Sequence, residues 1–273
     1  MIRRDGVGPV GILAVLPNGN ATFVTSGTVW HTAGMVYRSV LFDVGGTLVG
    51  PRESFGETYA RVLAPLGLAR PVEIFEEALR LQWDEMNRRV PVGVDRYSHL
   101  PGGERGYWLE FVRGVVRRVG DGTLPADFPD RVLEGLRDAF KDRAAWEIFD
   151  DVVPTLEALG EAGVQMGVVS NWDSRLPAVL ERLGLAHFFD VVIVSSLEGV
   201  EKPDPRIFHR AVEVLGADPK TTAHVGDLPE IDIDGARAAG LRGVLVDRTG
   251  RLDASLEPIA DLRPLPDLLS VRA

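Results

Sequence analysis

An aspartate followed by two glycines and a threonine closes an apolar run in the segment VLFDVGGTLVG, residues 40–50. A carboxylate at the end of a buried strand can attack phosphorus in line and form an aspartyl phosphate, which water then cleaves. Asp43 is therefore a candidate nucleophile. Because a phosphoryl group in transfer carries negative charge on its equatorial oxygens, hydrogen-bonding and positively charged groups must surround it.

Polar residues follow three later apolar runs in the same way, where each run is expected to end. The carboxyl ends of parallel strands lie at one edge of a sheet, so these residues are expected to share a pocket with Asp43. The hydroxyls of Thr47 and Ser170 and the ammonium of Lys202 would contact a bound phosphate. The later residues are Ser170 and Asn171 after the second run, Lys202 after the third, and Asp227 and Asp232 after the fourth.

Asp43, Asp227 and Asp232 would bring several anionic oxygens together, and such a cluster repels itself unless a cation is present. Hard oxygen ligands beside a phosphate favour Mg²⁺. Each residue also has an ordinary interpretation, since Asp227 could cap a helix and Lys202 could be a solvated loop charge. Their joint occurrence favours the catalytic interpretation.

Five short apolar runs rich in β-branched residues are typical of strands buried on both faces. Amphipathic helical patterns, most of them closed by glycine, separate the later runs. Alternation of this kind predicts an α/β fold with a parallel sheet covered on both faces. The runs span residues 38–44, 164–170, 191–196, 221–227 and 242–247.

Residues 51–149 show no comparable run and contain four amphipathic helical patterns instead. This segment is predicted as a helical cap, inserted after the first strand, that covers the pocket and excludes water. The core would then comprise residues 35–50 and 150–255, with a tail over 256–273.

Residues 1–34 are predicted as a poorly structured leader, and Met35 as the physiological start. Gly6, Gly8 and Gly11 form the pattern G-x-G-x-x-G, but too few residues precede it to supply the strand that a dinucleotide site needs. Two arginines before an apolar stretch are typical of a secretory signal, but Pro9 and the glycines argue against one here.

Forty acidic against thirty basic residues give a net charge of -10, which disfavours nucleic acid and anionic membranes as partners. The chain has no cysteine, so disulfides and thiolate chemistry are excluded and a cytoplasmic setting fits. No apolar run is long enough for a transmembrane helix. A small phosphorylated molecule is the expected partner, and the chain is expected to be a monomer or a homodimer.

Together, DVGGT, Ser170, Lys202 in EKPDP and VGDLPEID resemble the four motifs of the haloacid dehalogenase-like (HAD) hydrolase superfamily. The segments VVSNWDSRL, KPDPRIF and AHVGD look like the subgroup of the rhythmically expressed gene 2 product and the HAD-like hydrolase domain-containing proteins. The resemblance implies a Rossmann-like core with a helical cap. It also implies a phosphatase in which Asp43 and Lys202 are catalytic and Thr47, Ser170 and Asn171 bind substrate.

Gly45 departs from the pattern of the superfamily's phosphatases, which carry a second aspartate there to protonate the leaving group and activate water. The resemblance implies that position 45 also offers its backbone carbonyl to Mg²⁺, beside Asp43, Asp227 and Asp232, and glycine keeps that oxygen. Glu53, Glu57, His99 and Glu104 of the cap could replace the missing acid, but charged residues of this kind are mostly solvated.

Three hypotheses follow from Gly45. The first is a Mg²⁺-dependent phosphatase that acts slowly, or on substrates whose leaving groups need no proton. The second is a different HAD hydrolase such as a dehalogenase, which the pair Asp227 and Asp232 disfavours because a metal-free enzyme does not need that negative charge. The third is a phospho-ligand or protein-binding module that has kept the fold.

Overall fold

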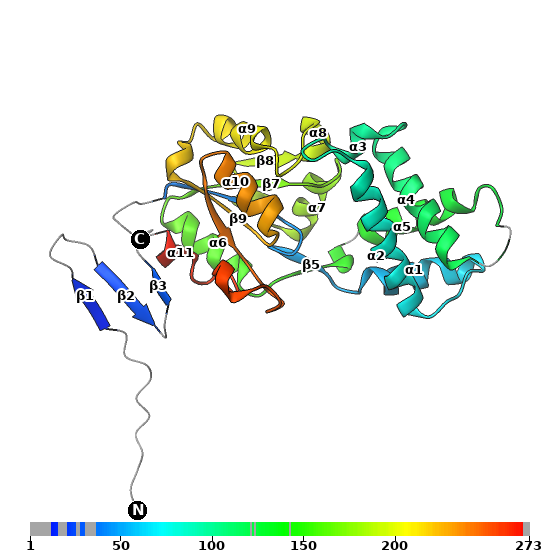
Figure 1. The fold of residues 1–273 in the computed structure, drawn as a ribbon, viewed down its shortest axis with the longest axis horizontal. Coiled ribbons are helices and arrows are strands. Elements are labelled where there is room, and N and C mark those ends of the chain that lie inside the picture. Colours follow the sequence, from blue (N-terminus) through cyan, green and yellow to red (C-terminus); the bar gives the residue numbers. More distant parts are fainter. Residues whose placement is uncertain are drawn as a thin grey trace, which may run out of the picture.

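The computed structural model describes residues 12–15, 21–25, 28–30, 37–120, 122, 124–141 and 143–269. Its centre is a five-stranded parallel sheet in the order β10-β9-β4-β7-β8 (Figure 1). Each strand lies within one of the five apolar runs, so the predicted α/β class is confirmed. The strands are β4 (Ser39–Phe42), β7 (Gln165–Ser170), β8 (Val191–Val194), β9 (Thr222–Gly226) and β10 (Arg242–Leu245).

Helices cover both faces of this sheet, as a parallel arrangement requires. Successive residues of a strand point to opposite faces, so Val40 and Phe42 pack against α6, α7 and α11, whereas Leu41 packs against α9 and α10. The core helices are α6 (Val152–Glu161), α7 (Leu176–Leu183), α8 (Ser195–Glu198), α9 (Pro205–Leu215), α10 (Gly235–Ala238) and α11 (Leu265–Leu268).

Short helical turns complete the connections of the core. Of these, η5 carries Asp232 and is a π-helical turn directly after β9. Asp204 caps α9 by accepting a hydrogen bond from Arg206 N at 2.9 Å, so the loop before this helix is fixed. The turns are η3 (Ala186–Phe188), η4 (Pro219–Thr221), η5 (Pro229–Asp234) and η6 (Ala254–Leu256).

The third strand ends earlier than expected. Ser195 and Ser196 were expected to close β8, but they begin α8 instead. The Ser195 hydroxyl donates to Trp172 O at 3.3 Å and Ser196 N donates to the same oxygen at 3.4 Å. These bonds draw the chain away from the strand ladder.

The segment between β4 and α6 forms a second body of helices beside the core (Figure 1). It has an apolar centre of its own, which includes Phe75, Tyr107 and Phe128. Its helices are α1 (Phe55–Leu63), η1 (Ala64–Leu66), α2 (Val72–Arg89), α3 (Arg96–His99), α4 (Gly103–Val119), α5 (Phe128–Lys141) and η2 (Arg143–Ala145). We call this helical segment the cap.

The cap leaves and rejoins the core through a two-stranded antiparallel ribbon, β5 (Val49–Pro51) and β6 (Trp146–Ile148). Val49 pairs with Ile148, and Pro51 pairs with Trp146. The sequence did not predict this ribbon, because strands of three residues are too short to show an alternating pattern.

Two terminal segments differ from their expected character. Most of residues 1–34, with Met35 and the G-x-G-x-x-G pattern, lies outside the described residues. The described part forms an unexpected antiparallel sheet of β1 (Ile12–Val15), β2 (Ala21–Thr25) and β3 (Thr28–Trp30). At the other end, Ile259, Leu262, Leu265 and Leu269 are buried in the main core, so the segment predicted as a tail belongs to the core packing up to residue 269.

Within the described ranges, no helix is both long enough and apolar enough to cross a bilayer.

Candidate active site

Asp43 lies one residue beyond β4, at the carboxyl end of the central strand. The carboxylate is 7% exposed and accepts two hydrogen bonds on Oδ1, from Ser170 Oγ at 3.0 Å and from Lys202 Nζ at 2.6 Å. Burial raises the pKa of Asp43, and the Lys202 charge opposes that rise. Three of the predicted residues, Asp43 and Ser170 at strand ends and Lys202 in the loop after α8, therefore meet.

Lys202 is buried between two carboxylates. Its Nζ lies 2.6 Å from Asp43 Oδ1 and 2.6 Å from Asp232 Oδ1. Burial alone would lower the pKa of Lys202, but the charges of Asp232 and Asp43 outweigh it and raise the pKa. The ammonium therefore stays charged at neutral pH and places a fixed positive charge beside the candidate nucleophile.

Asp232 is held on three sides. Its Oδ1 accepts from Lys202 and lies 3.0 Å from His224 Nε2, and its Oδ2 accepts from Leu228 N at 3.0 Å. Burial opposes ionisation, yet Lys202 and His224 lower the pKa of Asp232. His224 is fully buried within the core, and burial lowers its pKa.

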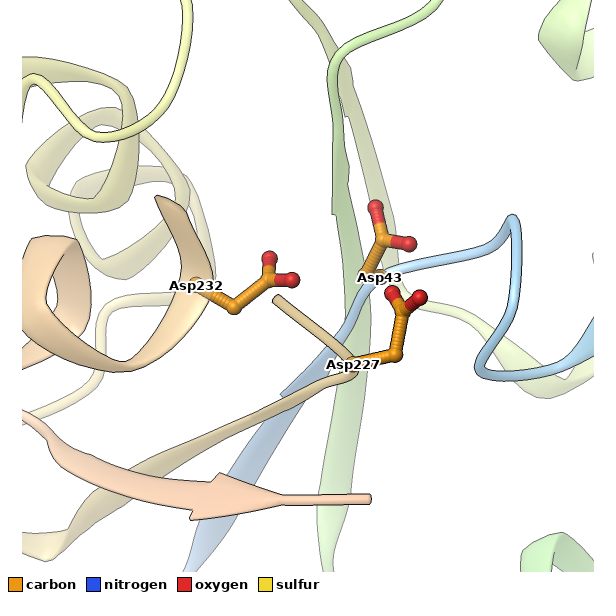
Figure 2. A group of neighbouring side chains, drawn as sticks. All are labelled: Asp43, Asp227 and Asp232. Carbon is orange, nitrogen blue, oxygen red and sulfur yellow. The ribbon is translucent and has the colours of Figure 1, made fainter. Parts of the chain in front are cut away.

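Asp227 follows β9 and completes a group of three carboxylates with Asp43 and Asp232. One oxygen from each lies within 4.8 Å of the others (Figure 2). Burial, together with the charges of Asp43 and Asp232, raises the pKa of Asp227 to about 7. This mutual repulsion is what a bound cation relieves, and three hard oxygen donors at this spacing fit Mg²⁺.

The two glycines after Asp43 have different surroundings. Gly46 has a φ of +77°, and a Cβ there would fall 2.3 Å from Asp227 Oδ2, so only glycine fits. A Cβ on Gly45 would lie 3.4 Å from Cζ3 of Trp172, an ordinary contact. The backbone therefore does not require glycine at position 45, and a side chain could be accommodated there.

Two residues predicted to bind substrate differ in their contacts with the rest of the protein. Asn171 donates from Nδ2 to Lys202 O at 2.9 Å and accepts from Lys202 N at 2.8 Å, so its amide clamps the lysine backbone. Thr47 is fully buried, and its Oγ1 has no hydrogen-bond partner among the described residues. Its carbonyl accepts from Arg248 at 2.6 and 3.0 Å, which anchors the loop after Asp43.

The cap contacts the two loops that carry Ser170, Asn171 and Lys202. Trp108 Nε1 donates to Asp173 Oδ2 at 3.0 Å, and Glu104 accepts from Ser174 N and Oγ at 2.7 Å each. Arg96 pairs with Glu201 through Nε at 2.8 Å. Asp173 and Ser174 lie shortly after Asn171 in the chain, and Glu201 directly precedes Lys202.

Three of the four residues considered as replacements for the missing acid at position 45 bind other groups of the protein. Glu57 forms a capping box with Ser54 at the start of α1, and Glu53 pairs with Arg61. Glu104 contacts Ser174, and His99 is exposed. From the sequence, no role was assigned to Trp172, Asp173 or Glu201, although all three lie within the quoted segments VVSNWDSRL and EKPDP.

Comparison with known proteins defines the class of this fold and site. The haloacid dehalogenase-like hydrolase family matches residues 37–240, and the chain belongs to that family. It is therefore a hydrolase, and the resemblance that the motifs indicated is confirmed.

Individual relatives cover most of the chain. Haloacid dehalogenase-like hydrolase domain-containing protein 3 from Bos taurus is 31% identical over 223 residues, covering 81% of this chain and 86% of the relative. A glyceraldehyde 3-phosphate phosphatase from Methanopyrus kandleri is 31% identical over 221 residues, covering 77% and 84%. The solved structure of a HAD hydrolase from Bacillus subtilis matches with a TM-score of 0.65 at 19% identity, covering 86% of this chain and 100% of that one, and shows the shared fold.

Proposed function

We propose that the protein is a Mg²⁺-dependent phosphatase that cleaves small phosphate monoesters through an aspartyl phosphate on Asp43. The observation that carries the proposal is the meeting of Asp43, Ser170, Lys202, Asp227 and Asp232 at one edge of the sheet. Phosphatases among the relatives support the same reaction class.

The chain's own groups have distinct tasks in this reaction. Both hydrogen bonds to Asp43 are made to Oδ1, which leaves Oδ2 as the attacking oxygen. Lys202 and the Ser170 hydroxyl hold the carboxylate and stabilise charge on the transferring phosphoryl group. Attack forms an Asp43 Oδ2–P bond and breaks the ester P–O bond, whose electron pair leaves with the alcohol oxygen. Water then cleaves the aspartyl phosphate and restores Asp43.

A magnesium ion would be held by Asp43, Asp227 and Asp232 together with the carbonyl of Gly45. When bound, it would neutralise charge on the phosphoryl oxygens. The raised pKa of Asp227, about 7, supports a cluster that requires a cation to remain fully ionised. A cytoplasmic location, and a monomer or homodimer in solution, belong to the same proposal.

Gly45 sets which esters react well. A positioned acid contributes about 10²- to 10⁴-fold to such reactions. Without it, leaving groups that depart as stable anions are favoured, such as acyl and aryl phosphates.

The test is phosphate release from a panel of acyl, aryl and alkyl phosphates. One series contains Mg²⁺, and in a parallel series Mg²⁺ is replaced by a chelator. We expect release that depends on Mg²⁺ and is abolished in Asp43→Asn. Equal background release of phosphate in the wild type and in Asp43→Asn would refute catalysis and favour the hypothesis of a binding module. Retention of ³²P on denatured protein after a short reaction, absent in Asp43→Asn, would report the covalent intermediate.

A further inference from the structure

The space beside Gly45 is bounded by an aromatic ring. Trp172 follows Asn171 after β7, and its Cζ3 lies 3.4 Å from the point where a Cβ of residue 45 would stand. A side chain at position 45 would be directed toward this ring. In the phosphatases that this chain resembles, the acid at position 45 faces the leaving group, so Trp172 borders the leaving-group side of the pocket.

Trp172 begins a row of four rings that leads from the site to the protein surface. Its ring centroid lies 5.1 Å from that of Trp146, which lies 6.0 Å from Phe140, which in turn lies 5.6 Å from Phe55. Trp146 is 8% exposed and Phe55 is 46% exposed, whereas Trp172 is half-buried. Trp146 therefore packs against the Trp172 ring, and Trp172 as a whole remains partly exposed.

The chain holds Trp172 in place through its neighbours. The Asn171 amide is bonded to the Lys202 backbone, Asp173 accepts from Trp108, and the Trp172 carbonyl accepts from Ser195 Oγ. A ring fixed in this way loses little freedom when a second ring stacks on it, which favours binding.

We propose that the site selects aryl phosphates and that Trp172 is the residue that determines this specificity, by stacking against the aromatic leaving group. The inference rests on the proposed phosphatase function. The conjugate acid of a phenolate has a pKa of about 10, against roughly 16 for that of an alkoxide. Phenolate is therefore the better leaving group, and an aryl ester tolerates the absence of an acid at position 45. The Asp43 Oδ2–P bond forms as the P–O(aryl) bond breaks, the electron pair leaves on the phenolate, and solvent protonates it.

The test compares phenyl phosphate with cyclohexyl phosphate, which has a similar size but no aromatic face. The measured quantity is the ratio of the two kcat/KM values in the Mg²⁺-loaded enzyme. We expect Trp172→Ala to lower this ratio about 10-fold, and Trp172→Phe, which keeps a ring, to restore most of it. Leu197→Ala, at an exposed position of α8, is the control and should keep the wild-type ratio. An equal loss for both esters in Trp172→Ala would overturn the inference, because it would indicate a structural role.

A binding measurement separates this inference from the proposed function. Calorimetry with Asp43→Asn, which cannot form the covalent intermediate, should detect tighter binding of phenyl than of cyclohexyl phosphate. The difference should disappear in the double variant Asp43→Asn, Trp172→Ala. If Mg²⁺-dependent hydrolysis occurs without any role of Trp172 in either assay, the inference fails and the function stands. If no ester is hydrolysed but the Trp172-dependent preference is present, the function fails and the aromatic site stands.

Discussion

Arg96, on cap helix α3, forms a bidentate ion pair with Glu201, the residue immediately before Lys202. Nε and Nη2 of Arg96 lie 2.8 and 3.0 Å from the two carboxylate oxygens, and Arg96 N donates to the same side chain at 3.2 Å. Val94 bridges to Val200 beside this pair, and Glu201 N donates to Gly93 O at 3.3 Å. The cap is thus joined, through backbone and side chains, to the loop that carries Lys202.

Removal of the Arg96 charge is expected to destabilise the protein, because the two side chains are only 14% and 9% exposed. Arg96→Ala should lower the free energy of unfolding by about 3 kcal/mol, since it leaves Glu201 buried without a charged partner. Urea unfolding measures this change. Arg105→Ala is the matched control: its pair with Asp130 is exposed, so the expected loss is below about 1 kcal/mol. Equal losses in the two variants would contradict the buried character of the Arg96 pair.

The Arg96 pair should also affect catalysis through Lys202. We expect Arg96→Lys, which keeps the charge but not the bidentate geometry, to have a kcat between those of the wild type and Arg96→Ala. Steady-state kinetics on phenyl phosphate, at a temperature where all three proteins are folded, measure this order. A kcat that is the same in all three would show that the pair stabilises the fold without positioning Lys202.

Loss of the Lys202 ammonium should reduce activity and make the protein depend on magnesium for stability. Lys202→Met leaves Asp43 and Asp232 buried without their shared positive partner. We expect kcat to fall by at least about 10²-fold. The melting temperature should fall as well and recover more with added Mg²⁺ than that of the wild type. Lys220→Met, at an exposed position, is the control. Unaltered turnover in Lys202→Met would exclude this lysine from the reaction.

The pKa of Asp227, about 7, predicts how pH acts on the metal-free protein. Because burial and the neighbouring carboxylates raise the folded-state pKa above the ordinary 3.8, the folded state binds more protons than the unfolded state between these values. The contribution of Asp227 to stability is therefore complete below about pH 4 and is lost as the pH rises through about 7. Thermal unfolding with chelator should show a fall over this range that is smaller in Asp227→Asn.

Magnesium should reverse that trend. A cation binds the ionised carboxylate, so the rise in melting temperature on adding Mg²⁺ should be larger at pH 7.5 than at pH 5.5, in accordance with linkage. Asp234→Asn, which changes an exposed carboxylate at the end of the turn η5 that follows Asp227, serves as the control and should retain the full magnesium effect. A magnesium effect of equal size at both pH values, or one that persists in Asp227→Asn, would argue against a metal site built on this carboxylate.

A carboxylate restored at position 45 should broaden the substrate range. Gly45→Asp places an acid against Trp172 without a backbone clash, and we expect hydrolysis of cyclohexyl phosphate to rise by about 10²-fold, at the lower end of the range for a positioned acid. Gly45→Asn has the same shape without the proton and should show no such rise. Measured kcat values for the two variants decide the matter, and a gain in both would assign the effect to packing.

The neighbouring glycine should behave differently. Gly46→Ala places a Cβ 2.3 Å from Asp227 Oδ2 at a φ of +77°. We expect a loss of unfolding free energy of about 1–3 kcal/mol together with weaker Mg²⁺ binding, because the carboxylate must move. Calorimetric titration with Mg²⁺ would measure the second effect, and wild-type affinity in Gly46→Ala would be inconsistent with a ligand role for Asp227.

The sequence was sufficient for the sheet and for the residues at its edge, for a physical reason. Buried parallel strands are continuous apolar runs, and each of Asp43, Ser170 and Asp227 directly ends or follows one, so chain order alone placed them at one edge. Lys202 follows the third run, with α8 between them, and was placed at the same edge by the same reasoning.

Contacts between segments far apart in sequence were not predictable. Arg96 and Glu201 are separated by 105 positions, and neither residue's local pattern indicates the other. The resemblance assigned Asn171 and Thr47 to substrate binding, which stays a prediction, but nothing in the local sequence indicated that the Asn171 amide binds the Lys202 backbone or that Thr47 is buried. The choice between contact with ligand and contact with protein depends on side-chain direction, which residue type does not determine.

The antiparallel ribbon of β5 and β6 places the start and the end of the helical insertion side by side. The inserted segment of about a hundred residues is thus attached to the core at one place, and it has an apolar interior of its own. An insertion attached in this way can be lengthened, shortened or exchanged without a change in the sheet edge that carries the candidate site. Chimaeras joined at this ribbon, with insertions taken from relatives, offer a direct route to new selectivity on an unchanged reaction centre.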